Sequence, residues 1–178
     1  MTRKKLLLAA LAALLLVLTP VALFLNFYLP SQMVLTIEDT YERRVDNTPN
    51  DTTDNNWRDV YYISTVDEKG KVHVFRNEDT AWGFPWYFKF NSADVRATAA
   101  TLKNNKQKAV VRYYGWRINM LSMFPNATSV RPDHGGMLIP WFNIAFFSLI
   151  FGVFAWIAVF FRRRGKRSTA PGAEALNA

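Results

Sequence analysis

The chain has 178 residues, no cysteine and a formal net charge of +8. Without cysteine it can form no disulfide framework, thiolate nucleophile or cysteine metal site. The positive charge does not indicate nucleic-acid binding, because the excess of Lys and Arg lies in short tails beside two long apolar segments.

The first apolar segment, residues 6–28, predicts a transmembrane helix. Its run from 6 to 25 contains no charged residue, and about 20 apolar residues are enough to cross the hydrocarbon core of a bilayer. We expect an anchor that is not cleaved, because the run is longer than a signal-peptide core and the following LNFYLP offers no Ala-x-Ala site. The basic tail, residues 1–5, is then expected to stay in the cytoplasm.

Residues 29–137 have the composition of a soluble domain and begin with strand signals. The segment 34–45 mixes β-branched residues, tyrosine and charge, which is typical of a strand. Residues 46–56 contain no apolar side chain and predict a solvated loop. Residues 57–77 predict a β-hairpin that turns at DEKGK, where Gly70 can adopt positive φ.

A helix is predicted over residues 91–102. Asn91 is a natural N-cap, and Asp94 in the first turn complements the helix dipole. Val95, Ala99 and Leu102 recur at helical spacing and predict one buried face.

Two more strands are predicted after this helix, over 108–118 and 127–132. Gly115 interrupts the first of them and predicts a bend. The order of three strands, one helix and two strands is that of a small OB-like barrel. An open antiparallel sheet with one helix is the alternative.

The stretch before the helix is unusually aromatic. Phe84, Trp86, Phe88 and Phe90 fall on every second residue, and period two places them on one face of an extended segment. We expect this face to be core, so that Tyr87 points away from it. A membrane-facing lip and a ligand groove are the alternatives, and the candidate binding surface comprises Arg76, Glu78, Asp79, Trp82, Trp86 and Tyr87.

The second apolar segment, residues 138–161, predicts another transmembrane helix, and the basic tail 162–178 is expected in the cytoplasm. Neither segment contains an ionisable residue, which argues against a transporter or channel built from this chain alone. A stripe of small residues could pack against another helix, although such residues are also frequent in membrane helices. The stripe consists of Ala145, Ser148, Gly152 and Ala155.

Three long stretches resemble a known family. They are FRNEDTAWGFPWYFKFNSAD (75–94), YGWRINMLSMFPNATSVRP (114–132) and LIPWFNI (138–144). With the order of span, domain and span, they resemble the bacterial membrane-protein family of unknown function DUF1523. The resemblance covers nearly the whole chain and implies a bacterial inner-membrane protein, with no catalytic residues to transfer.

The sequence contains no recognisable catalytic or metal-binding motif. His73 and His134 lack metal-ligand spacing, and Glu78 and Asp79 are adjacent, so they would point to opposite faces of an extended segment. Phosphate loops, dinucleotide fingerprints and nucleophile elbows are absent from the sequence. We therefore expect no cofactor, no metal and no enzymatic activity.

These features together predict a membrane α+β protein in which two transmembrane helices flank one small β-rich domain outside the cytoplasm. We expect residues 29–137 in the periplasm, where they would act as a non-enzymatic binding or scaffolding module. The expected partners are the lipid bilayer and a protein or second copy bound through the second helix, with no nucleic acid. A ligand-binding or accessory subunit of a larger complex is the alternative, and an envelope hydrolase is the third possibility.

Overall fold

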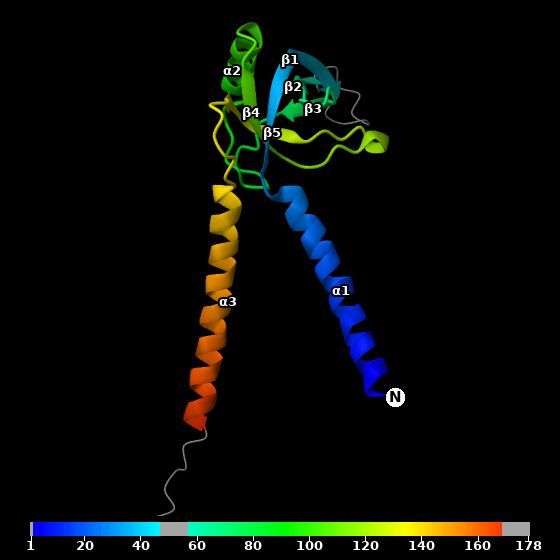
Figure 1. Ribbon diagram of the computed structural model, residues 1–178, viewed down its shortest axis with the longest axis vertical. Coiled ribbons are helices and arrows are strands. Elements are labelled where there is room, and N and C mark those ends of the chain that lie inside the picture. The colour runs from blue at the N-terminus through cyan, green and yellow to red at the C-terminus, as the bar shows by residue number, and fades with distance from the viewer. Residues whose placement is uncertain (1, 47–56, 169–178) are drawn as a thin grey trace, which may run out of the picture. The chain divides into compact units, whose positions relative to one another are not determined.

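The computed structural model describes residues 2–46 and 57–168. By contacts it divides into two compact units, Met1–Ile139 and Pro140–Ala178. The predicted solvated loop 46–56 lies outside the described residues, apart from Asp46 at the end of a strand. The elements (Figure 1) are α1 (Arg3–Tyr28), β1 (Ser31–Asp46), β2 (Trp57–Val66), β3 (Val72–Asn77), α2 (Ser92–Asn104), β4 (Lys108–Tyr114), the 3₁₀ turn η1 (Asn119–Leu121), β5 (Asn126–Pro132) and α3 (Trp141–Ser168).

The five strands form one mixed sheet that closes on itself in the order β1-β2-β3-β5-β4. β1 pairs antiparallel with both β2 and β4, and β2 and β3 form the predicted hairpin. The closing contact between β3 and β5 is parallel and has one register pair, Arg76 with Asn126. The alternative of an open antiparallel sheet is therefore wrong.

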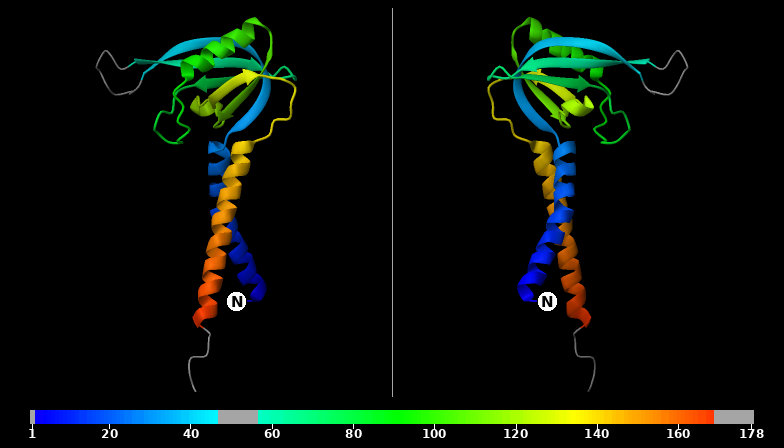
Figure 2. Two further views of the ribbon diagram at one scale, coloured as in Figure 1. Left: turned by 90° about the vertical axis from the view of Figure 1, so that its left-hand side faces the viewer. Right: turned by 90° about the vertical axis from the view of Figure 1, so that its right-hand side faces the viewer.

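The core lies inside this closed sheet, under α2. The predicted face of α2 is buried at Val95, Ala99 and Leu102. It packs on the barrel (Figure 2), whose buried side chains are Leu35, Ile37, Ile63, Phe75, Ala109, Val111, Ala127 and Val130. Burying a side chain of Leu or Phe size stabilises a fold by about 1.5–3 kcal/mol. The barrel interior therefore supplies the main stabilisation of this domain.

The start of α2 is capped differently from the prediction. Asn91 occupies the N-cap position but makes no side-chain cap hydrogen bond. Instead, the Asp79 carboxylate accepts hydrogen bonds from the Ser92 backbone N–H at 2.9 Å and from the Ser92 hydroxyl at 2.8 Å. The carboxylate of a residue in the preceding loop thus satisfies a free N–H at the start of the helix, as an N-cap side chain would, and its negative charge complements the helix dipole. Asp79 therefore ties the aromatic stretch to α2.

α1 and α3 are long and apolar enough to cross a membrane, by length and composition. Both predicted segments are helical, although their bounds differ from the predicted 6–28 and 138–161. α1 begins in the basic tail, and α3 begins after Pro140, whose carbonyl accepts the Ile144 N–H. The most apolar window of each helix is unburied within the structure. Helices of this composition need an apolar environment to cover them.

Candidate functional site

The aromatic stretch is an exposed loop between β3 and α2, and the prediction that its alternating rings are core is wrong. Trp82 is 77% exposed and Trp86 is 63% exposed. Residues 81–90, called the aromatic loop below, are not a strand. Left-handed backbone turns the chain within the loop, so the geometry of an extended strand does not apply. The other rings exposed by half or more are Phe84, Phe88 and Phe90.

The intervening residues of the loop face inward, and Lys89 is the most deeply buried of them. Only 5% of Lys89 is exposed. Its Nζ donates hydrogen bonds to Asn77 Oδ1 at 2.5 Å and to the Glu78 carbonyl at 3.1 Å. Its backbone N–H donates to Thr80 Oγ1, and its carbonyl accepts the Ala81 N–H. Lys89 thus fastens the end of the aromatic loop to the end of β3.

The predicted surface around Arg76, Glu78 and Asp79 is partly used to hold this lysine. Burial lowers the pKa of Lys89 to about 8, while the negative charges of Asp79 and Glu78 oppose that shift. Glu78 also forms an ion pair with Arg76, with 2.5 Å between Oε2 and Nε. Asp79 caps α2. The two carboxylates therefore have structural roles around the base of the loop.

Tyr87 is the second inward-facing residue and joins the loop to α1. Its hydroxyl donates a hydrogen bond to the backbone carbonyl of Tyr28, in the last turn of α1. Its ring stacks on Tyr114 of β4, with centroids 4.9 Å apart. Burial raises the pKa of Tyr87 to about 12. The prediction that Tyr87 points away from the packed face is wrong, because the loop presents the opposite set of side chains to the barrel.

The exposed rings of the loop continue the surface of α1. Phe84 lies with its ring centroid 4.6 Å from that of Tyr28 and 6.2 Å from that of Phe24. Trp86 contacts Phe84 edge to face at 5.1 Å. The loop therefore lies beside the C-terminal end of the apolar helix.

The connection after β4 also contacts this end of α1. The Gly115 N–H donates to the Phe27 carbonyl at 2.8 Å, and Trp116 Nε1 donates to Asn26 Oδ1 at 2.9 Å. Gly115 has φ of +91°, and a Cβ there would lie 3.5 Å from Pro125 and 3.6 Å from the Phe27 ring. The predicted bend at Gly115 is confirmed, and it allows β4 to meet the end of α1.

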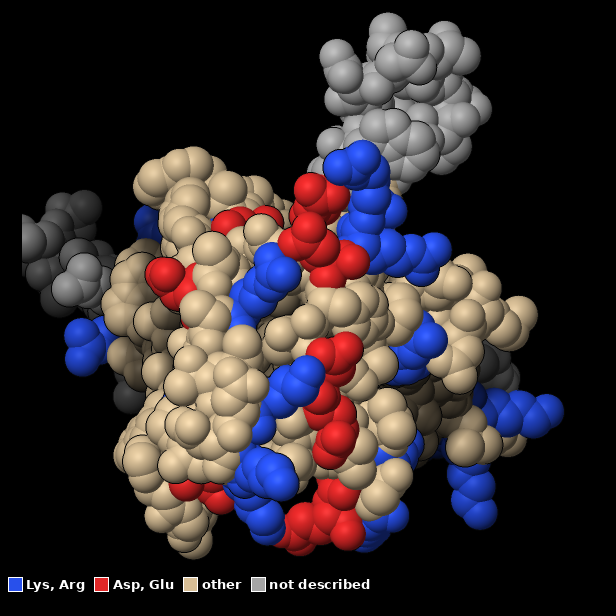
Figure 3. Space-filling model, turned by 90° about the horizontal axis from the view of Figure 1, so that it is seen from above, with Lys and Arg blue, Asp and Glu red and all other residues tan. Residues whose placement is uncertain are grey.

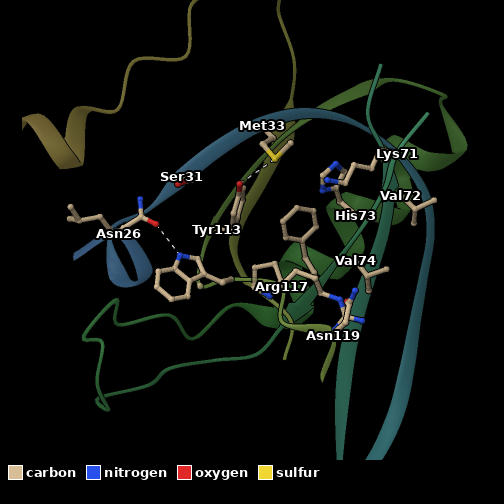
Figure 4. Close-up of a pocket in the computed structure, with 15 residues that line it drawn as sticks. Asn26, Ser31, Met33, Lys71, Val72, His73, Val74, Tyr113, Arg117 and Asn119 are labelled. Carbon is tan, nitrogen blue, oxygen red and sulfur yellow. Dashed lines mark hydrogen bonds between the residues drawn. The ribbon is translucent and has the colours of Figure 1, made fainter. Parts of the chain in front are cut away.

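A cavity of about 700 Å³ opens beside this junction (Figure 4). The Tyr113 hydroxyl lies 3.2 Å from Met33 Sδ on its wall, and His73 Nε2 lies 3.2 Å from Asp67 Oδ2. Sequence reasoning missed this cavity because its wall combines segments far apart in the chain. The lining residues are Asn26, Leu29, Ser31, Met33, 71–75, Tyr113, 115–117, Asn119 and Pro125.

One wall of the cavity is an open edge of β3. Arg76 donates its backbone N–H to the Pro125 carbonyl, on the side away from β2. In an antiparallel pair, alternate residues direct their N–H and C=O groups to the same side. Val72 and Val74 therefore direct theirs to that side as well, and no described strand pairs with them there. Hydrogen-bonding groups of the backbone thus face the cavity.

A second hollow, of about 400 Å³, is lined in part by Phe27 and Tyr28 at the C-terminal end of α1. Arg76 and Phe84 line it together with Tyr28 and Tyr114. Of the predicted surface residues, the structure thus brings Arg76 to the hollow and directs Trp82 and Trp86 outward. The predicted set does not form one groove.

The stripe of small residues lies entirely within α3. An added Cβ at Gly152 would meet nothing within 4 Å in the structure, so the helix has room for close approach at this position. Among the described residues there is no group of three or more His, Asp or Glu side chains that could hold a metal ion.

Comparison with known proteins gives a family but no activity. A family model described as "Protein of unknown function (DUF1523)" matches residues 5–165. An uncharacterized protein of Haemophilus influenzae is 44% identical over 110 residues, which are 60% of this chain and 63% of that protein, so the chain spans less than two thirds of this relative. Among solved structures, a mutant homopentamer of Salmonella typhi PltB has 9% identity and a TM-score of 0.40, covering 64% of this chain and 97% of that one.

Proposed function

The chain belongs to the family of unknown function DUF1523, and we propose that it is a two-span inner-membrane protein with a non-enzymatic binding module on the outer side. In this proposal α1 and α3 both cross the bilayer. Their basic flanks keep both termini in the cytoplasm, and residues 29–137 lie in the periplasm as an OB-like barrel. The strand order and the position of α2 between β3 and β4 support that description of the barrel.

The observation that carries the binding role is the open edge of β3 on the cavity. The edge offers backbone donors and acceptors at Val72 and Val74, and exposed edges of this kind accept an added strand. The cavity walls combine apolar and polar side chains, with Met33, Tyr113 and Arg117 among them. An extended polypeptide segment satisfies both the backbone groups and the mixed walls, so we assign a peptide segment of a partner protein as the ligand.

Topology is tested with a reporter that is active only in the periplasm. A fusion after Ala178 should be silent, and an insertion at Thr52 should be active, because the basic tails hold both ends inside. The reverse pattern would overturn the proposed orientation.

The binding site is tested with a photo-reactive amino acid in place of Val72, in cells that express the full chain. Val72 is exposed at the open edge, so light should produce covalent adducts with a partner. The same amino acid in place of Glu68, on the adjoining turn, should produce few.

A second substitution then separates strand addition from chance contact. Val74→Pro removes the N–H that faces the cavity and leaves the bonds of β3 to β2 intact, because Val74 directs its N–H away from β2. Adducts at position 72 should disappear in Val74→Pro and persist in Val74→Thr, which keeps the N–H. Equal adducts in both variants would refute strand addition, and no adducts at position 72 would refute the site.

A further inference from the structure

We propose that the aromatic loop, residues 81–90, inserts into the headgroup region of the bilayer that α1 crosses, as a second membrane contact of the barrel. This inference rests on the proposed membrane insertion of α1 and adds a lipid surface as the partner of the loop. Three observations carry it: the exposed rings, the fastening of the loop, and its continuity with α1.

The loop exposes an apolar surface that water does not favour. Its large outward side chains are all aromatic, and Trp82 and Trp86 are the most exposed of them. Three of these rings contact one another edge to face. The centroid of the Trp82 ring lies 5.6 Å from that of Phe88 and 5.5 Å from that of Phe90. Soluble proteins rarely expose contiguous apolar patches of more than a few hundred Å², and larger ones mark interaction surfaces.

The rings are exposed by a fastened loop, so they cannot simply fold back onto the barrel. Lys89 holds one end through Asn77, and Tyr87 holds the middle through Tyr28. The inward-facing side chains of Tyr87 and Lys89 are therefore both held by hydrogen bonds. The outward positions have no place in the barrel, whose interior is filled by other residues.

The loop meets α1 at the level where the apolar helix ends. Phe84 packs against Phe24 and Tyr28, which lie in the last two turns of α1. The long apolar run of α1 stops at residue 25, so this end is expected at the boundary between hydrocarbon and water. Trp and Tyr side chains are enriched at that depth. The rings beside this end therefore share its environment.

The distribution of charge separates this surface from the face over α2 and β1. Residues 81–90 contain one charged side chain, Lys89, and it is buried. On the face over α2, Lys and Arg alternate with Asp and Glu (Figure 3). Ion pairs there include Arg96 with Glu42 and Lys103 with Asp39, each at 2.7 Å. That face is suited to water, and the aromatic loop is suited to the headgroup layer.

The absence of cysteine from the chain allows a direct test of depth. A single cysteine replaces Trp82 in one variant and Phe88, a second site on the loop, in another. Each cysteine is labelled with a nitroxide. The full chain is then reconstituted in bilayers of phosphatidylglycerol and phosphatidylethanolamine. Val17→Cys, in the middle of α1, serves as the membrane control, and Thr101→Cys, exposed on α2, serves as the water control. For each nitroxide, the rate of collision with oxygen is then divided by the rate of collision with a water-soluble nickel complex, which gives an oxygen-to-nickel ratio.

We expect the oxygen-to-nickel ratio at Trp82→Cys and Phe88→Cys to be several-fold above that at Thr101→Cys and below that at Val17→Cys. A loop ratio equal to that of Thr101→Cys, with a high ratio at Val17→Cys, would overturn the lipid contact and leave the proposed anchoring intact. A low ratio at Val17→Cys would instead overturn the anchoring itself. Loop labels that are shielded from both reagents would mean burial against protein, which also overturns the lipid contact.

Discussion

The barrel interior and the aromatic loop are both rich in large apolar side chains, yet they have opposite environments. Phe75 in β3 is 1% exposed, whereas Trp82, five residues after β3 ends, is 77% exposed. The interior side chains alternate along paired strands, so the closed sheet decides which of them face inward. In the loop, the hydrogen bonds of Lys89 and Tyr87 determine which side chains face inward.

Polar side chains can therefore determine which way neighbouring apolar side chains face. An aromatic ring buried in the barrel stabilises the fold. A ring that is directed outward by a fastened loop can instead contact lipid or another molecule. Substitutions in the two regions should therefore differ in their cost to stability.

Phe75→Ala should have the largest effect. The ring is fully buried against Tyr113 and the other core residues, and truncating such a ring costs about 3–5 kcal/mol. Thermal denaturation of the full chain in detergent should show a markedly lower Tm or no folded barrel. A variant with the Tm of the wild type would mean that the barrel interior is not the source of stability.

Lys89→Met should have the next largest effect on the stability of the barrel. It keeps most of the aliphatic stem but leaves Asn77 Oδ1 without its hydrogen bond from the ammonium group, and loss of a bond to a charged group costs about 1.5–3 kcal/mol. Proteolysis should also become faster within residues 81–90. Lys103→Met, which removes a half-buried lysine of α2 that forms an ion pair with Asp39, is the matched control, and an equal effect there would contradict a special role for Lys89.

The pH dependence of unfolding tests the burial of the Lys89 amine. Burial lowers the pKa of Lys89 to about 8 from 10.5, so between these values the folded chain binds fewer protons than the unfolded chain. Stability then rises with pH across this window and is insensitive to this group below it. The Tm difference between wild type and Lys89→Met should therefore widen from about pH 8 toward pH 10.5. A constant difference would mean that the amine is not buried.

Gly152→Leu should have a smaller effect, and on association rather than on the barrel. A large side chain would prevent close approach of another helix along the stripe, and contacts of this kind contribute about 1 kcal/mol each. Self-association or complex formation in a quantitative intramembrane assay should weaken partially. Val153→Leu adds bulk beside the stripe and should have little effect, so equal loss in both variants would argue against the stripe.

Trp86→Ala should have the smallest effect on stability. Because the ring is 63% exposed, its removal should change the free energy of unfolding within about 0.5 kcal/mol, as for most surface positions. The measurement is the same denaturation used for Phe75→Ala. A loss of several kcal/mol would restore the interpretation of this ring as core and remove the contrast between the two regions.

The local elements of this protein follow from its sequence. The hairpin 57–77 has turn chemistry at Gly70, and α2 has apolar residues at Val95, Ala99 and Leu102, so short-range periodicity determines both. The two long apolar helices follow from length and composition alone. The DUF1523 family was also evident from the quoted stretches, and the family match confirms it.

The candidate site is formed by contacts between segments that are far apart in the chain. Local periodicity in the sequence does not predict such contacts. Asp79 replaces Asn91 as the cap of α2 because the loop brings its carboxylate there. The same alternation of aromatics would be core on a paired strand. Here it faces outward, since Lys89 reaches Asn77 and Tyr87 reaches the end of α1. Local periodicity is enough to predict the elements and their amphipathic faces. The face of the aromatic loop that meets the barrel depends on tertiary contacts, because partners far away in the chain satisfy the polar groups of the loop.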